Sequence, residues 1–167
     1  MSKQLGFTMQ SQEQTEWCWA AVTASIAAYF NSVGPSGGPW RQCEVARTVR
    51  NDATCCVNGT TPNCNHDNTL DPALTAVHHL AGAVNPSPIS YARISQEVDN
   101  NRPVAVRIGW YGGGGHFVVL GGYDDSGGGQ IVDVEDPWYG PSTYDYSQFC
   151  TAYQSGAGRW TDTYPVA

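Results

Sequence analysis

One cysteine in the sequence is placed where it could act as a nucleophile. Cys18 stands between Trp17 and Trp19, where a polar stretch changes into a long apolar run. The Ala-rich run has a broad apolar face at helical spacing, which predicts a helix over about residues 16–30 with Cys18 in its first turn. Unpaired N–H groups and the positive end of the helix dipole favour a thiolate there, so the position suits nucleophilic catalysis. The alternative interpretation is a small buried cysteine that packs with the two tryptophans.

A histidine with open backbone around it is the candidate general base. His116 follows the four glycines Gly112–Gly115 and begins an apolar stretch that predicts a strand over residues 116–123. Glycines at a sheet edge let a substrate chain or the cysteine-bearing helix approach closely. A phosphate-binding loop is a weaker interpretation, because no Lys-Ser/Thr pair and no helix follow. The three other histidines lack such a setting, since two lie on a predicted helix and one lies in a loop.

An aspartate after the next predicted strand is the candidate partner of this histidine. The stretch Asp124–Gly129 predicts a hairpin turn that leads into an antiparallel strand over residues 130–135. With the turn centred in this stretch, Asp136 would lie directly across from His116. A carboxylate at this place would orient the imidazole and stabilise its protonated form.

Further helices and strands must hold these residues in place. Apolar spacing predicts helices over about residues 40–51, 70–80, 90–100 and 147–153, and strands over 103–108 and 159–164. Helices come mostly first and antiparallel strands last, which indicates an α+β fold. The sequence shows no internal repeat and no linker. We therefore expect a single domain over residues 1–167, with a helical part over about 12–100 and a β part over about 101–167.

Four of the six cysteines lie close together in a loop-like stretch rich in Asn, Thr, Gly and Pro. The four are Cys43, Cys55, Cys56 and Cys64. The pattern predicts a loop held by disulfides in an oxidising compartment, with Cys150 as the odd cysteine and the pairing left open. A zinc site that includes His66 is the alternative, but two adjacent cysteines fit the usual ligand spacing poorly.

Composition and charge argue against several classes of function. The net charge of −7 argues against nucleic acid as a partner, because phosphate binding requires clustered Lys and Arg. No apolar run reaches the roughly 18 residues of a membrane span, so we expect no membrane partner. The first residues show no signal-peptide apolar region, so we expect either a trimmed leader or another route of delivery.

The three motifs together resemble those of papain-like cysteine peptidases. The matching positions are Gln12 six residues before Cys18, Trp19 directly after it, Gly115-His116, and the acid before Pro137-Trp138. Within that group the sequence is most similar to bacterial secreted or effector proteases, such as the type III effector cysteine proteases. These share a Trp-Cys-Trp-Ala-Ala start and a Gly-His-Phe-Val-Val…Asp-Pro-Trp end. The sequence is more distantly similar to peptidases that cut bacteriocin leaders after a double glycine. An aspartate as the acid departs from the asparagine of plant papains.

The resemblance implies a papain-like fold, in which a central catalytic helix packs on a C-terminal antiparallel sheet. Cys18 would be the nucleophile, His116 the base, and Asp136 the residue that orients the base. The side-chain amide of Gln12 and the N–H of Cys18 would form the oxyanion hole. Gln10 and Gln14 are the alternatives for that amide. The implied substrate-groove residues are Trp19, Gly114, Gly115 and Trp138.

We therefore expect a monomeric cysteine-type endopeptidase that cleaves a protein or peptide substrate through an acyl-enzyme and uses no cofactor and no metal. A transglutaminase, deamidase or amidase on the same triad is the alternative among enzymes, because one fold hosts several reactions. A non-catalytic, disulfide-stapled binding module is the alternative outside enzymes. The resemblance favours a bacterial effector or toxin domain that is secreted or delivered into a target cell by a secretion system. Such a toxin would meet a dedicated inhibitor or immunity protein.

Overall fold

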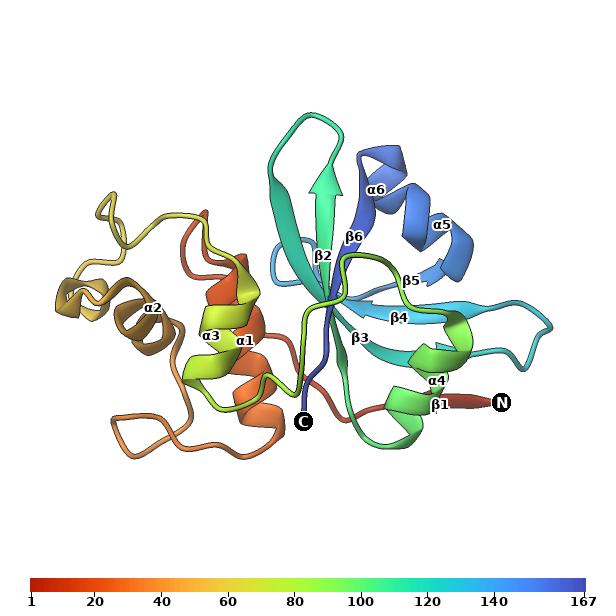
Figure 1. The fold of residues 1–167 in the computed structure, drawn as a ribbon, viewed down its shortest axis with the longest axis horizontal. Helices are drawn as coiled ribbons and strands as arrows, with labels where there is room; N and C mark the ends of the chain where they lie inside the picture. The colour runs from red at the N-terminus through yellow and green to blue at the C-terminus, as the bar shows by residue number, and fades with distance from the viewer.

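Three helices gather at one end of the structure and an antiparallel sheet occupies the other (Figure 1). The computed structural model describes residues 1–167. The helices are α1 (Cys18–Tyr29), α2 (Gln42–Arg50) and α3 (Leu70–Ala76). α1 contacts α2, α3 and the sheet, so the cysteine-bearing helix lies at the junction of the two parts. The predicted α+β architecture is confirmed.

The composition of α1 suits this central position. Every residue from Trp19 to Ala27 is buried. The helix itself carries alanines and other apolar residues on all its faces, so it can pack against neighbours on every side. The hydroxyls of Thr23 and Ser25 donate to the carbonyls of Trp19 and Ala21 at 2.8 and 2.7 Å, so these polar groups are satisfied within the helix.

The sheet has six strands in the order β5-β4-β3-β2-β6, and β1 pairs with β3 beside this path. The strands are β1 (Ser2–Gln4), β2 (Val104–Trp110), β3 (Gly115–Asp124), β4 (Ile131–Glu135), β5 (Ser142–Asp145) and β6 (Gly158–Tyr164). The sequence pattern predicts four of them and misses β1 and β5. Both are short, and no buried apolar residue marks either, so only their backbone pairing defines them.

The boundary between the two parts differs from the one that the sequence indicates. Helix α4 (Tyr91–Asp99) contacts β1, β2 and β3, so it belongs with the sheet and not with the first three helices. Strand β1 also lies in the sheet although it precedes α1. The helical part therefore ends after α3. The short helices α5 (Tyr146–Thr151) and α6 (Tyr153–Gly156) lie beside β6 (Figure 1).

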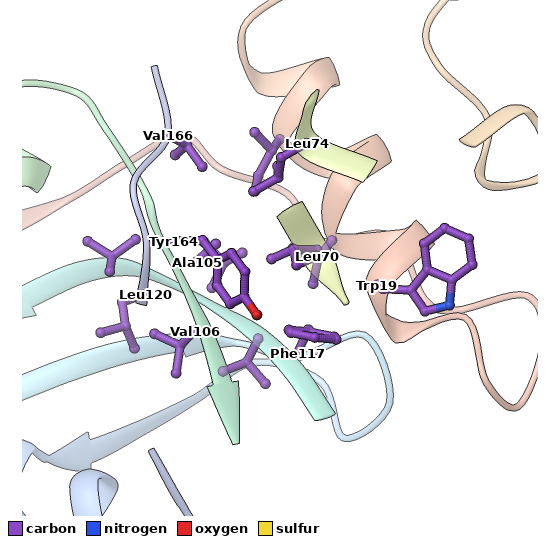
Figure 2. Close-up of a cluster of buried hydrophobic side chains, with 14 of the residues drawn as sticks. Trp19, Leu70, Leu74, Ala105, Val106, Phe117, Leu120, Tyr164 and Val166 are labelled. Carbon is purple, nitrogen blue, oxygen red and sulfur yellow. The ribbon is translucent and has the colours of Figure 1, made fainter. Parts of the chain in front are cut away.

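One cluster of buried side chains joins the helices to the sheet (Figure 2). Trp19, Leu70 and Leu74 come from the helical side, and Phe117 and Leu120 come from β3. Removing this apolar surface from water stabilises the contact between the parts. The cluster therefore fixes the position of α1 relative to the strand that begins near His116.

The cysteine-rich loop carries two disulfides, Cys43–Cys56 and Cys55–Cys64. The predicted disulfide loop is confirmed, and the structure supplies the pairing that the spacing left open. All four sulfurs are used in these bonds, so they do not form the thiolate set that a zinc site requires. Cys18 and Cys150 are free.

The helices of this fold are short. The longest, α1, has 12 residues, and none has the length and apolar character required to cross a membrane.

Candidate active site

Cys18 lies in a groove between the helical part and the sheet, and the groove has two halves. The first half has a volume of about 370 Å³ and contains His116. We call it the aromatic half, because its lining includes Trp110, Trp138 and Tyr139. The second half has a volume of about 300 Å³. We call it the polar half, because its lining includes His66, Asn68, Thr69 and Arg107. Glu16, Cys18, Asp67 and Gly115 line both halves, so the nucleophile candidate stands between them.

Cys18 is the first residue of α1 and is half-buried. Its backbone N–H has no backbone acceptor, as the first turn of a helix dictates. No acidic side chain lies in this turn, and no side chain caps it. The N–H group is therefore free to donate to a negatively charged group bound in the groove.

His116 and Asp136 form a buried pair next to this cysteine. The distance between Nε2 of His116 and Oδ1 of Asp136 is 2.9 Å, and the two residues are 6% and 3% exposed. Burial lowers the pKa of His116, but the hydrogen bond to Asp136 and the interaction with Cys18 outweigh it and raise the pKa to about 9. The imidazole is therefore protonated at neutral pH.

Asp136 receives more donors than the histidine alone. Its Oδ1 also accepts the backbone N–H groups of Trp138 and Tyr139 at 2.7 and 2.9 Å. Its Oδ2 accepts the hydroxyl of Tyr153 at 2.6 Å. Burial raises the pKa of Asp136, but the hydrogen bond from His116, the charge of His116, and the hydrogen bonds from Tyr153 and Tyr139 lower it below its usual value. Asp136 is thus held as a carboxylate in a fixed orientation.

The pairing register that produces this contact differs from the predicted one. Val119 lies opposite Glu135, and the register shifts between Leu120 and Gly122. Asp136, one residue beyond the end of β4, would therefore face Val118 and not His116. The contact forms because His116 is two residues along the same face of β3, and a diagonal pair of this kind is within reach of long side chains.

Aromatic rings enclose the histidine. Trp110 stacks on His116 with ring centroids 5.7 Å apart, and Tyr139 meets the ring edge-on at 6.1 Å. Trp138, one of the groove residues that the resemblance implies, lines the groove but is 57% exposed and does not stack on His116. Trp110, which ends the strand before the glycine loop, lies beside His116 through the pairing of β2 with β3.

Gln12 lines the aromatic half, whereas Gln10 and Gln14 do not. Its Nε2 donates to the carbonyls of Gln14 and Thr15, at 2.8 Å each, and its Oε1 is buried without a partner. Both amide hydrogens therefore brace the turn before α1. To donate to a substrate oxyanion, Gln12 must release one of these carbonyls.

The remaining predicted groove residues divide into lining and support. Gly114 and Gly115 line the groove. Trp19 is fully buried, and its indole N–H donates to the carbonyl of His66 at 3.0 Å. Trp19 borders the polar half but has no exposed surface for a substrate to contact, so it supports the loop at the edge of this half.

The disulfide loop holds the segment that carries the cysteine, a role that the sequence does not indicate. The indole N–H of Trp17 donates to the carbonyl of Cys64 at 2.7 Å. The backbone N–H of Glu16 donates to Oδ1 of Asn65 at 2.9 Å, and Nδ2 of Asn65 donates to the hydroxyl of Thr15 at 2.9 Å. The turn before Cys18 is therefore tied to the residues that follow the second disulfide.

The profile of a family described as "Peptidase_C39 like family" matches residues 4–167. Among solved structures, the digestive procathepsin L2 proteinase of the Tenebrio molitor larval midgut is similar, with 15% identity and a TM-score of 0.49. That match covers 96% of this chain and 64% of the procathepsin, so the chain spans less than two thirds of that protein. The Pseudomonas avirulence protein AvrPphB is similar with 13% identity, a TM-score of 0.47, and coverage of 96% of this chain and 97% of AvrPphB. No curated protein sequence matches significantly.

Proposed function

Because the chain belongs to the Peptidase_C39-like family, we propose that it is a cysteine peptidase whose reaction is carried by Cys18, His116 and Asp136. The observation that supports this triad most directly is the buried His116–Asp136 pair beside the free cysteine, with Nε2 and Oδ1 2.9 Å apart. A histidine that is protonated at neutral pH stabilises a neighbouring thiolate, which is the reactive form of cysteine.

The geometry supports the following reaction. The sulfur of Cys18 forms a bond to the carbonyl carbon of the scissile peptide, and the carbonyl oxygen becomes an oxyanion. The imidazolium of His116 then gives its proton to the amine nitrogen as the C–N bond breaks, which leaves an acyl-enzyme. A water molecule attacks this thioester, His116 accepts its proton, and the acid product leaves with Cys18 restored.

The backbone N–H of Cys18 is the oxyanion donor that needs no rearrangement, because it has no backbone acceptor. Gln12 serves as the second donor once substrate displaces one of its two bonds to the turn. Asp136 keeps the imidazole oriented through both steps, since its own position is held by Tyr153 and two backbone N–H groups.

The two disulfides support an oxidising compartment as the place of action, which agrees with secretion or delivery outside the producing cell. The effector or toxin role and the inhibitor partner remain predictions from the motifs.

The test is mass spectrometry of the protein after treatment with the epoxide E-64, without dithiothreitol so that the disulfides persist. We expect a single adduct on the wild type, no adduct on Cys18→Ala, a much slower reaction for His116→Ala, and full labelling of the control Cys150→Ala. A folded wild type that forms no adduct would contradict the proposal and favour the binding module.

A second measurement separates hydrolysis from the other reactions of such a triad. The protein is incubated with a denatured protein mixture, and new N-termini and released ammonia are quantified. New N-termini that depend on Cys18 support a peptidase. Ammonia or cross-links without new N-termini would indicate a deamidase, amidase or transglutaminase.

A further inference from the structure

The two halves of the groove receive different parts of a substrate, provided that the proposed peptidase function holds. The leaving amine must lie near His116, because His116 gives it a proton. His116 lines the aromatic half and not the polar half. The residues on the N-terminal side of the scissile bond, which stay attached to Cys18, therefore extend into the polar half.

Arg107 lines the sheet side of the polar half. It lies on β2, opposite Phe117 on one neighbouring strand and Asp162 on the other. Its Nη1 donates to the hydroxyl of Thr161 at 3.0 Å and lies 3.8 Å from a carboxylate oxygen of Asp162. Its Nε and Nη2 donate to no protein group, and the side chain is 33% exposed. One edge of the guanidinium is therefore free to form hydrogen bonds.

Because Gly115 has no side chain, it leaves the space that the Arg107 guanidinium occupies. A Cβ at this position would lie 2.7 Å from Nη2, 2.8 Å from Cζ and 2.9 Å from Nε of Arg107. Gly115 immediately precedes His116 and lines both halves of the groove. The free guanidinium edge is thus next to the catalytic pair and within the part of the groove that takes the acyl segment.

The other charges that line the polar half come from the opposite wall. They are Glu16 and Asp67, which are both exposed, and Asp67 pairs with the neighbouring His66. Exposed charges are screened by water and salt, whereas the charge of Arg107, whose side chain is 33% exposed, is screened less. The Nε and Nη2 atoms of arginine form a fork that matches the two oxygens of a carboxylate.

From these contacts we propose that Arg107 binds an acidic side chain of the substrate, located within the three residues on the N-terminal side of the scissile bond. The enzyme then prefers acidic peptides at one of these positions, and the preference resides in the guanidinium and not in the triad.

The test uses acetyl-tripeptide acyloxymethyl ketones, which carry an electrophilic carbon where the scissile carbonyl would be. The sulfur of Cys18 displaces the acyloxy group and forms a thioether, and the rate is followed by intact mass without reductant. Three pairs of compounds place Glu or Gln at the first, second or third residue, with Ala elsewhere. In the wild type we expect the Glu compound to react about tenfold faster at one position, which corresponds to a charge-assisted hydrogen bond.

Two variants assign the effect. Arg107→Gln should react with the Glu and Gln compounds at equal rates, while its Cys18 keeps its wild-type rate with iodoacetamide, which needs no binding site. Arg159→Gln is the control, because Arg159 is an exposed arginine of β6 that lies over the ring of Tyr111. It should keep the preference for Glu.

Equal rates for Glu and Gln in the wild type, or a preference that persists in Arg107→Gln, would overturn the assignment of Arg107. A wild type whose Cys18 reacts with none of the six peptides would contradict the proposed peptidase function itself, and the inference with it.

Discussion

The Nε2 atom of His116 lies 2.9 Å from Oδ1 of Asp136, so Nδ1 is the ring nitrogen left to interact with Cys18. This assignment gives each nitrogen a separate role. Nε2–H anchors the ring to a carboxylate that three other donors hold in place, and in the proposed reaction Nδ1–H gives the proton to the leaving amine.

Folding stability should fall at alkaline pH because of His116. Its pKa rises from 6.5 to about 9 on folding, so the folded state holds this proton where the unfolded state has lost it. The contribution of His116 to the free energy of unfolding is fully present below its pKa in the unfolded state. It is lost as the pH rises through its pKa in the folded state. Urea unfolding between pH 6 and 9.5 should show this decline in the wild type and a smaller one in His116→Gln. Parallel curves for the two proteins would contradict the raised pKa.

Loss of the Tyr153 hydroxyl should weaken catalysis without unfolding the protein. Tyr153→Phe keeps the ring, which packs against Trp110 and Phe149, and removes only the 2.6 Å bond to Asp136. We expect kcat to fall about tenfold with KM unchanged, as for a hydrogen bond to a charged group. The pKa of Asp136 should rise, so the acid limb of the pH profile should move to higher pH. Tyr144→Phe is the control, because its ring contacts Tyr153 but its hydroxyl does not bind Asp136. Unchanged kinetics in Tyr153→Phe would show that the other donors suffice.

The Cys55–Cys64 disulfide should matter more for activity than Cys43–Cys56, because the carbonyl of Cys64 binds Trp17. Replacing Cys55 and Cys64 by Ala should lower the free energy of unfolding by about 2–3 kcal/mol. It should also slow E-64 labelling, because the loop that binds Thr15, Glu16 and Trp17 is released.

The pair Cys43 and Cys56, replaced in the same way, should lose stability but keep more of the labelling rate. In the wild type, thiol titration of the denatured, unreduced protein should find two thiols per chain, from Cys18 and Cys150. Six thiols would contradict the disulfides.

A methyl group at Gly115 should alter substrate choice. Gly115→Ala places a Cβ against the Arg107 guanidinium, and this flexible end can move away at little cost in stability. We expect an unchanged melting temperature and a reduced preference for the Glu peptides. Gly112→Ala, at which a Cβ would meet nothing within 4 Å, should behave as the wild type does. An equal preference for Glu in the wild type, Gly115→Ala and Gly112→Ala would mean that the acidic side chain of the substrate binds away from the Arg107 guanidinium.

Removal of the Gln12 amide tests its part in the oxyanion hole. Gln12→Ala should lower kcat by about 100-fold, the usual effect of losing one oxyanion donor. Gln10→Ala is the control, because Gln10 binds Gln42 and does not line the groove. A fall in stability with kcat unchanged would instead limit Gln12 to bracing the carbonyls of Gln14 and Thr15.

Local chemistry in the sequence was sufficient to predict the elements that carry the site. Helical spacing placed Cys18 at the start of a helix, and alternating and apolar stretches placed His116 at the start of a strand and Asp136 at the end of the next. These features depend on short-range periodicity, so neighbouring residues specify them. The clustered cysteines likewise predicted a disulfide loop, but not its pairing.

Contacts between distant segments were decided only in the tertiary structure. The pairing of β3 with β4 placed Asp136 opposite Val118 and not opposite His116, and side-chain reach makes the contact. Tyr153 reaches Asp136 from a later helix, and Trp110 covers His116 from the neighbouring strand. Such contacts depend on how whole elements pack against one another, and no local pattern in the sequence records that packing.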